Sequence, residues 1–228
     1  MLNIGRLHYI TQDGISGFDH AALAEKACLG GAKWVQLRIK GQSAEEVRAT
    51  ALKTLKICDK YGARLIINDF PEIALEIGAA GVHLGKEDQD PQIARKHLGK
   101  GFIIGGTANT FEDIQKLAAA EVDYIGLGPF RFTATKKNLS PVLDLEGYQN
   151  IMERCEKEKI HIPVIAIGGI TITDLPGLFK AGCFGIALAS PVNCSENKEE
   201  AMRIFVKAVS EEVSNIVNTP VKGQNINL

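Results

Sequence analysis

Short β-rich runs alternate with amphipathic helical patterns along the chain, and this alternation most constrains what the chain can fold into. The runs recur about every 20 to 30 residues, as repeated βα units require. Eight of them together predict an α/β protein with a single (β/α)8 TIM barrel, whose active site lies at the C-terminal ends of the strands. The runs are 7–11, 34–39, 64–69, 81–85, 102–106, 124–128, 163–169 and 185–190.

The segments between the runs have the period of helices. In 44–62, "AEEVRATALKTLKICDKYG", apolar residues return every three or four positions, and Gly62 is a natural helix stop. No linker or low-complexity segment interrupts the series. We therefore expect one barrel domain over residues 1–228, with 218–228 as a polar C-terminal appendage.

The composition of the chain excludes several classes of partner. Its 26 Lys and Arg residues nearly cancel its 27 Asp and Glu residues, so no bulk field attracts nucleic acid or an acidic membrane. Five cysteines without a CxxC pair argue against a disulfide framework and a zinc site. No run of about 18 apolar residues and no signal cleavage site occur. We expect a soluble cytoplasmic protein that acts on small molecules, and the sequence leaves open whether it is a homo-oligomer.

The second run carries polar residues at alternate positions. Gln36, Arg38 and Lys40 share one face, while the aliphatic residues between them share the other. The aliphatic face should pack on the helices, which leaves a glutamine and two cations inside the barrel at the strand end. A snorkelling charge or an internal salt bridge is one interpretation. An anion-binding site is the interpretation we favour, since an unpartnered interior charge is costly.

The next two runs end in carboxylates. Asn68 and Asp69 end the third run, and Asp88 follows the fourth. Neighbouring strands lie about 5 Å apart, so the two carboxylates can converge. Asp88 alone could cap a helix, but a carboxylate pair beside cations is typical of Mg²⁺ bound together with a phosphate. The cations, the metal and the interior face together suggest a pyrophosphate site.

Two later loops suggest a second phosphate site. Gly168 and Gly169 end the seventh run and Ser190 ends the eighth, where barrels often cradle a phosphate with backbone N–H groups. Thr107 adds a hydroxyl at the same rim, although a helix cap would explain it equally well. His83 points inward by alternation, and we assign it no chemical role.

These motifs resemble those of the thiamine phosphate synthase family. The similarity runs from about residue 7 to about residue 208, and the combination of QxRxK, ND, GxxD and TxTK is specific. The segments are "VQLRIK", "LIINDF", "GVHLGKED", "GPFRFTATKK", "VIAIGGI" and "GIALAS". The resemblance implies a transferase that joins 4-amino-2-methyl-5-hydroxymethylpyrimidine diphosphate to 4-methyl-5-(2-hydroxyethyl)thiazole phosphate. Thiamine phosphate and pyrophosphate would be the products, with Mg²⁺ as cofactor.

The resemblance also implies roles for particular residues. The pyrimidine diphosphate would be bound by Gln36, Arg38, Lys40, Asn68, Thr107 and Lys136, with Arg38, Lys40 and Lys136 as the catalytic groups. The magnesium ligands would be Asp69 and Asp88. The thiazole phosphate would be held by Thr133, Thr135, Gly169, Ala189 and Ser190.

The long loop at 128–138, "GPFRFTATKKN", fits this reaction. We expect it to close over both substrates and exclude water, because the family reaction passes through a carbocation that water would capture. The protein would stabilise charge on the leaving pyrophosphate and align the thiazole nitrogen.

The chain departs from the family pattern at three places. Thr107 stands where serine is usual, and Lys86 stands where glutamine is common. Phe132, preceded by Arg131, replaces the proline before the first loop threonine. Thr107 keeps the hydroxyl and would tighten the pocket slightly, and Phe132 with Arg131 leaves the hinge and resting position of the loop open. Lys86 would either weaken the metal site at Asp88 or pair with a phosphate.

Other functions remain as alternatives. A thiazole tautomerase has the same fold but generally lacks the full set of cations for a diphosphate. A non-catalytic barrel would bind thiamine phosphates without turnover. Isomerases of aromatic amino-acid synthesis would need an acid and base pair that we do not identify here.

Overall fold

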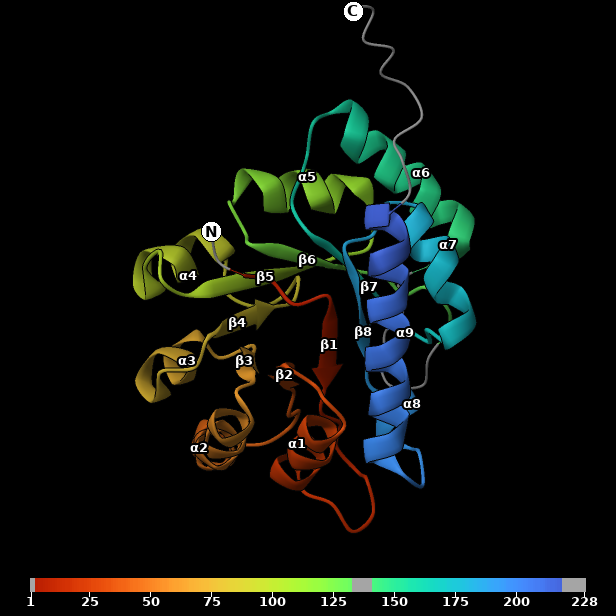
Figure 1. Cartoon of the computed structure of the whole chain (residues 1–228). Coiled ribbons are helices and arrows are strands. Elements are labelled where there is room, and N and C mark those ends of the chain that lie inside the picture. The colour runs from red at the N-terminus through yellow and green to blue at the C-terminus, as the bar shows by residue number, and fades with distance from the viewer. Residues whose placement is uncertain (1–2, 133–140, 219–228) are drawn as a thin grey trace, which may run out of the picture.

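The chain forms a closed barrel of eight parallel strands surrounded by helices (Figure 1). The computed structural model describes residues 3–132 and 141–218. The strands pair in sequence order, and β8 closes the barrel against β1. The strands are β1 Leu7–Ile10, β2 Trp34–Leu37, β3 Arg64–Asn68, β4 Gly81–Leu84, β5 Ile103–Ala108, β6 Tyr124–Leu127, β7 Val164–Ile167 and β8 Gly185–Leu188. The predicted (β/α)8 barrel is confirmed.

Helices follow the strands and form the outer layer (Figure 1). They are α1 His20–Leu29, α2 Ala44–Tyr61, α3 Pro71–Ile77, α4 Pro91–Leu98, α5 Phe111–Ala119, α6 Asp144–Lys157, the 3-10 turn η1 Ile172–Asp174, α7 Leu175–Lys180, α8 Ser190–Asn193 and α9 Lys198–Asn218.

Local sequence signals set the ends of α2. Ser43 and Glu46 form a capping box at its start, which satisfies backbone N–H groups that have no partner within the helix. Gly62 ends the helix with a φ of 60°, a conformation that glycine adopts without steric cost. The helix stop predicted at Gly62 is confirmed.

The buried apolar side chains form two clusters, one between the strands and the helices and one inside the barrel. Val35 and Leu37 of β2 belong to the cluster that packs the strands against the helices, as the alternation predicted. Trp34, on the opposite face, belongs to a smaller cluster inside the barrel, where His8 stacks on its ring at 4.2 Å between ring centroids. Side chains therefore fill the inside of the barrel, and in this fold the active site lies at the C-terminal ends of the strands.

The long helix α9 closes the outer layer. It contacts α1, α7 and α8 on the outside of the barrel (Figure 1). In residues 3–132 and 141–218, no helix has both the length and the apolar character needed to span a bilayer. The appendage expected at 218–228 lies outside the described residues, apart from Asn218 at the end of α9.

Candidate active site

A lysine and two aspartates gather at the C-terminal ends of β2, β3 and β4. Lys40, which is half exposed, forms an ion pair with Asp69 through its Nζ and Oδ2 atoms. The carboxyl of Asp88 lies within hydrogen-bonding reach of Asp69. Burial, followed by the neighbouring Asp88, raises the pKa of Asp69 above its usual value, while Lys40 acts in the opposite direction. The structure therefore brings together three of the predicted site residues.

The backbone around the two carboxylates is unusual. Asp69 has a φ of 71°, a region that is sparsely populated by residues other than glycine. Its N–H donates to the carbonyl of His83 on β4 at 2.9 Å. Asp88 accepts a hydrogen bond from the N–H of Gly85 at 2.6 Å, whereas the N-cap of α4 is Asp90. Asp88 is thus not the helix cap that the sequence left open, and both carboxylates are held at the strand ends.

This pair of carboxylates fits a magnesium ion. Asp69 has a raised pKa beside the second carboxyl group, Asp88, and a shared divalent cation would stabilise the charged forms of both. Among the described residues, no group of three or more His, Cys, Asp and Glu side chains is arranged to hold a metal ion. Asp69 and Asp88 would therefore need water and phosphate oxygens to complete the coordination, which is the usual arrangement for Mg²⁺.

Two buried amide side chains precede the charged residues along β2 and β3. Gln36 is 4% exposed and Asn68 is 7% exposed, and they stand at the ends of β2 and β3. Gln36 hydrogen-bonds to the hydroxyl of Tyr124 inside the barrel. Burial raises the pKa of Tyr124 well above its ordinary value, so this hydroxyl keeps its proton.

Residues after β1 support the end of β2, and the sequence reasoning missed them. Thr11 accepts a hydrogen bond from the backbone N–H of Arg38 at 3.1 Å. The ring of buried His20 lies between Thr11 Oγ1 at 2.8 Å and Asp13 Oδ1 at 3.1 Å. Asp13 also accepts from the N–H of Lys40 at 3.4 Å. The signal was the polar "TQDG" at 11–14, which begins at the last residue of the first run, at the same rim as the residues that were chosen.

Thr107 is part of a hydrogen-bonded group inside the barrel. It lies within β5 rather than after it, and the N-cap of α5 is Thr110. The ring nitrogens of His83 lie 3.0 Å from Thr107 Oγ1 and 3.0 Å from the Tyr124 hydroxyl. His83, to which the sequence assigned no role, therefore links the predicted substrate residue Thr107 to Tyr124.

On the side of the barrel mouth formed by the ends of β7 and β8, the candidate binding groups belong to the backbone. Gly168 and Gly169 follow β7 with φ values of 104° and 66°, which side-chain-bearing residues rarely adopt. β8 ends at Leu188, so Ser190 is the first residue of α8 and Ala189 is its N-cap, a correction to the predicted strand end. The glycines and the start of α8 follow adjacent strands, where the sequence predicted the second phosphate site.

Two of the departures from the family pattern have defined contacts. Lys86 lies 2.5 Å from Asp113 at the start of α5, measured from Nζ to Oδ2. It is therefore engaged away from Asp88. Phe132 is 75% exposed, whereas Arg131 before it is anchored to the loop after β7. The predicted residues Thr133, Thr135 and Lys136 lie outside the described residues.

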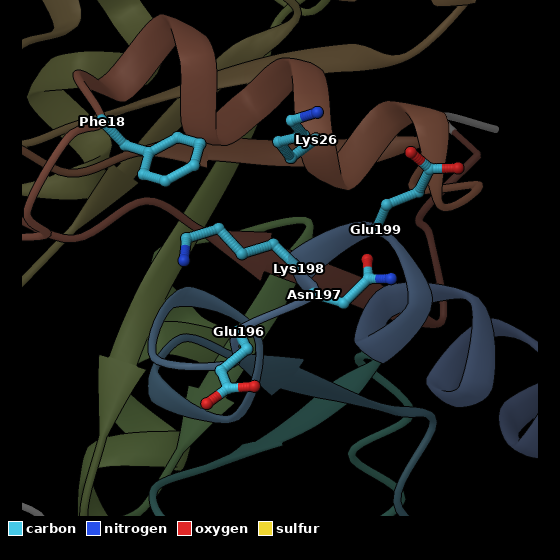
Figure 2. Close-up of a pocket in the computed structure, with 6 residues that line it drawn as sticks. All are labelled: Phe18, Lys26, Glu196, Asn197, Lys198 and Glu199. Carbon is cyan, nitrogen blue, oxygen red and sulfur yellow. The ribbon is translucent and has the colours of Figure 1, made fainter.

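A surface pocket of about 330 Å³ lies between α1 and the start of α9 (Figure 2). Its lining residues are Phe18, Lys26, Glu196, Asn197, Lys198 and Glu199. Lys198 donates to the carbonyl of Ser195 at 2.9 Å, and its Nζ lies 4.5 Å from the centre of the Phe18 ring. These residues differ from those that gather at the strand ends, and we assign the pocket no chemical role.

A closed barrel with a lysine–dicarboxylate cluster on one side of its mouth and a glycine turn on the other has the features of phosphate-binding (β/α)8 enzymes. A family model described as thiamine monophosphate synthase matches residues 7–192. The chain belongs to this family.

Individual relatives agree with the family match. The thiamine-phosphate synthase of Bacteroides fragilis is 48% identical over 200 residues, which cover 87% of this chain and 98% of that protein. The one from Methanospirillum hungatei is 38% identical over 200 residues, with 87% and 95% coverage. The solved structure of a thiamine phosphate pyrophosphorylase from Pyrococcus furiosus superposes with a TM-score of 0.80 at 29% identity, covering 91% of this chain and 96% of that one.

Proposed function

We propose that the protein is a thiamine phosphate synthase. It joins 4-amino-2-methyl-5-hydroxymethylpyrimidine diphosphate to 4-methyl-5-(2-hydroxyethyl)thiazole phosphate and releases pyrophosphate. The observation that carries the proposal is the cluster of Lys40, Asp69 and Asp88 at the ends of β2–β4. A thiazole tautomerase handles a monophosphate and has no need for this combination of a cation and a carboxylate pair.

The cluster would bind the diphosphate group. Lys40 is half exposed and its ion pair with Asp69 lies at the strand ends, so its ammonium can move to an incoming phosphate oxygen. Asp69 and Asp88 would hold Mg²⁺, which when bound would neutralise negative charge on the diphosphate oxygens. Arg38, whose backbone Thr11 anchors, would add a second cation on the same side.

The reaction would proceed by departure of the leaving group first. The bond from the pyrimidine methylene carbon to the diphosphate oxygen breaks, and the electron pair leaves with the diphosphate. The thiazole nitrogen then forms the new C–N bond to the cationic carbon. The protein contributes charge stabilisation on the departing group and alignment of the two substrates, and no general base is required.

The thiazole phosphate would be bound on the other side of the mouth. Backbone N–H groups of the turn at Gly168 and Gly169 and at the start of α8 would hold its phosphate. Lys136, Thr133 and Thr135 would complete the two sites. All five cysteines are free, which supports a location in a reducing compartment such as the cytoplasm.

A product assay tests the proposal. Purified protein is incubated with both substrates and Mg²⁺, and thiamine phosphate is measured by chromatography. We expect product from the wild type and a loss of about a hundredfold or more for Asp69→Asn, because the Mg²⁺ that would neutralise charge on the leaving group loses one of its two carboxylate ligands. Absence of product from the wild type would overturn the synthase assignment.

Asp123→Asn is the matched control. Asp123 is also a partly buried carboxylate paired with a cation, Arg95, at 2.6 Å, but it precedes β6 at the opposite end of the barrel. We expect this variant to retain activity. An equal loss in both variants would mean that general destabilisation, rather than the site, explains the effect of Asp69→Asn.

A further inference from the structure

Arg131 connects the chain after β6 to the turn after β7. Its backbone N–H donates to the carbonyl of Gly168 at 2.9 Å, and its Nη1 donates to the carbonyl of Gly169 at 2.9 Å. The preceding residue continues the pairing, since the N–H of Phe130 donates to the carbonyl of Ile167 at 2.8 Å. One residue therefore holds the carbonyl oxygens on both sides of the Gly169 α-carbon.

A buried carboxylate fixes the guanidinium of Arg131 in place. Both oxygens of Asp174 accept from Arg131 at 2.5 Å, and the Asp174 side chain is 8% exposed. Asp174 also accepts from the N–H and the hydroxyl of Thr171, each at 2.7 Å. The hydrogen bonds from Arg131, the largest cause, lower the pKa of Asp174 to about 2, so the carboxylate stays charged at neutral pH. Such a bidentate pair has one preferred geometry.

The positions of these carbonyls determine where the neighbouring N–H groups point. In a trans peptide the N–H points away from the C=O of the same unit. Because the Gly168 and Gly169 carbonyls both point at Arg131, the N–H groups of Gly169 and Ile170 point away from it. Successive backbone N–H groups in a turn form an anion-binding concavity.

The approach of the two segments leaves no room for a side chain. A Cβ added at Gly168 would lie 2.8 Å from the Cβ of Pro129, and one added at Gly169 would lie 3.0 Å from the Cβ of Arg131. The glycines therefore allow Arg131 to reach the turn, and Arg131 in turn holds the glycines.

We infer that Arg131 is a positioning residue for the phosphate of the thiazole substrate, acting through the N–H groups of Gly169 and Ile170. This inference rests on the proposed function. The guanidinium acts through the turn rather than by direct contact with the phosphate, because Asp174 neutralises it and holds it against the Gly169 carbonyl.

Steady-state kinetics of Arg131→Ala test the inference. We expect the KM for the thiazole phosphate to rise about tenfold, the effect of losing a charge-assisted hydrogen bond. The kcat and the KM for the pyrimidine diphosphate should stay near the wild-type values. Arg131→Lys keeps one donor and should recover part of the loss. An unchanged KM for the thiazole phosphate in Arg131→Ala would overturn the inference.

Arg154→Ala is the matched control. Arg154 is equally exposed, pairs with Glu112 at 3.1 Å and lies over the Phe111 ring, as Arg131 lies over the Phe130 ring. It joins α6 to α5, away from the glycine turn. We expect no change in either KM, because exposed ion pairs contribute little.

Asp174→Asn separates positioning from direct contact. If Arg131 acts through the turn, loosening its partner should raise the KM for the thiazole phosphate. If Arg131 binds the phosphate directly, removing the competing carboxylate should lower that KM, which would overturn the inference.

Calorimetric titration with the thiazole phosphate distinguishes failure of the inference from failure of the proposed function. If the wild type makes no product but binds the thiazole phosphate about tenfold more tightly than Arg131→Ala, the synthase assignment fails and the inference stands. If the wild type turns over and the two proteins bind equally, the inference alone fails. If the wild type neither turns over nor binds, both fail.

Discussion

The two sides of the barrel mouth differ in the kind of group that they offer to an anion. The ends of β2–β4 carry charged side chains, Lys40, Asp69 and Asp88, which pair with one another. The turn after β7 carries two glycines whose carbonyls are held by Arg131. The first side depends on charge and the second on backbone shape. Substitutions should therefore affect the two substrates separately, and in different ways.

The largest expected effect is on the charged side. Lys40→Met removes a cation while keeping most of the side-chain volume. We expect kcat/KM for the pyrimidine diphosphate to fall about a hundredfold, because one charge-stabilising contact to the leaving group is lost. Initial rates at varied pyrimidine diphosphate measure the change.

Lys60→Met is the control for this variant. Lys60 also forms an exposed ion pair, with Glu25 at 3.0 Å, but it lies on α2, outside the barrel. It should leave kcat/KM unchanged. An equal loss in both variants, or no loss in Lys40→Met, would contradict the role of the charged side.

Shape should matter more than charge on the glycine side. Gly169→Ala adds a Cβ at a φ of 66° and at 3.0 Å from Arg131. We expect about a tenfold rise in the KM for the thiazole phosphate, since strain of about 1–3 kcal/mol must displace the turn. The KM for the pyrimidine diphosphate should change little, as measured by kinetics with each substrate varied in turn.

Gly62→Ala is the control variant, because it introduces a similar backbone strain without the close contact to Arg131. Gly62 ends α2 with a φ of 60°, and no atom lies within 4 Å of an added Cβ there. Both variants should lose similar stability, but only Gly169→Ala should weaken the thiazole phosphate. A similar rise in KM for both would show that the turn has no special role.

A smaller effect is expected from the support beneath the charged side. Thr11→Val removes the hydroxyl that accepts from the N–H of Arg38. We expect the KM for the pyrimidine diphosphate to rise about threefold and the free energy of unfolding to fall by about 1–2 kcal/mol, the effect of leaving a buried donor unsatisfied. Kinetics and urea denaturation measure the two quantities.

Thr54→Val is the corresponding control. The Thr54 hydroxyl is buried and donates to the carbonyl of Thr50 within α2. This variant should lose stability without a change in KM. If Thr11→Val left the KM at the wild-type value, the link between β1 and the end of β2 would be structural only.

The smallest expected effect is on the thermal midpoint of the metal-free protein. Asp69 has a raised pKa, so its charged form destabilises the folded state above that pKa and the penalty disappears as the pH falls below the unfolded value. Asp88→Asn removes the second carboxylate, and at neutral pH it should raise the thermal midpoint by about 1–3 °C. Solvent screening keeps this gain small.

Thermal melts in a chelator at pH 7 and pH 4 test this prediction. The advantage of Asp88→Asn should shrink at pH 4, where protonation removes the repulsion in the wild type. The same variant should lose synthase activity with Mg²⁺. A lower thermal midpoint for Asp88→Asn at pH 7 would contradict repulsion between the two carboxylates.

The sequence predicted side-chain directions well because they depend on local periodicity. The alternation of Gln36, Arg38 and Lys40 placed them on the inner side of β2, and the structure confirms the packing of the opposite face. Asp69 and Asp88 were predicted to meet because consecutive parallel strands are neighbours in a barrel, and they do meet. Roles in binding substrate or metal stay predictions.

Partners across loops could not be predicted in the same way. The sequence left open whether Lys86 interacts with Asp88 or with a phosphate. In the structure, Lys86 pairs with Asp113. His20 beneath β2 and Arg131 beside the glycine turn were not assigned contacts, because the partners of each depend on how separate loops fold back.

The sequence by itself determined the number and order of the strands, the face of β2 on which Gln36, Arg38 and Lys40 lie and the end of the barrel where they gather. These follow from a period of two in strands and a period of 3.6 in helices, which are local properties of the chain. The tertiary structure alone decided that Lys40 faces Asp69 and that Arg131 and Asp174 hold the turn at Gly169. Such pairs join residues that are 29 to 43 positions apart, and their distances depend on the register and loop paths of the closed barrel.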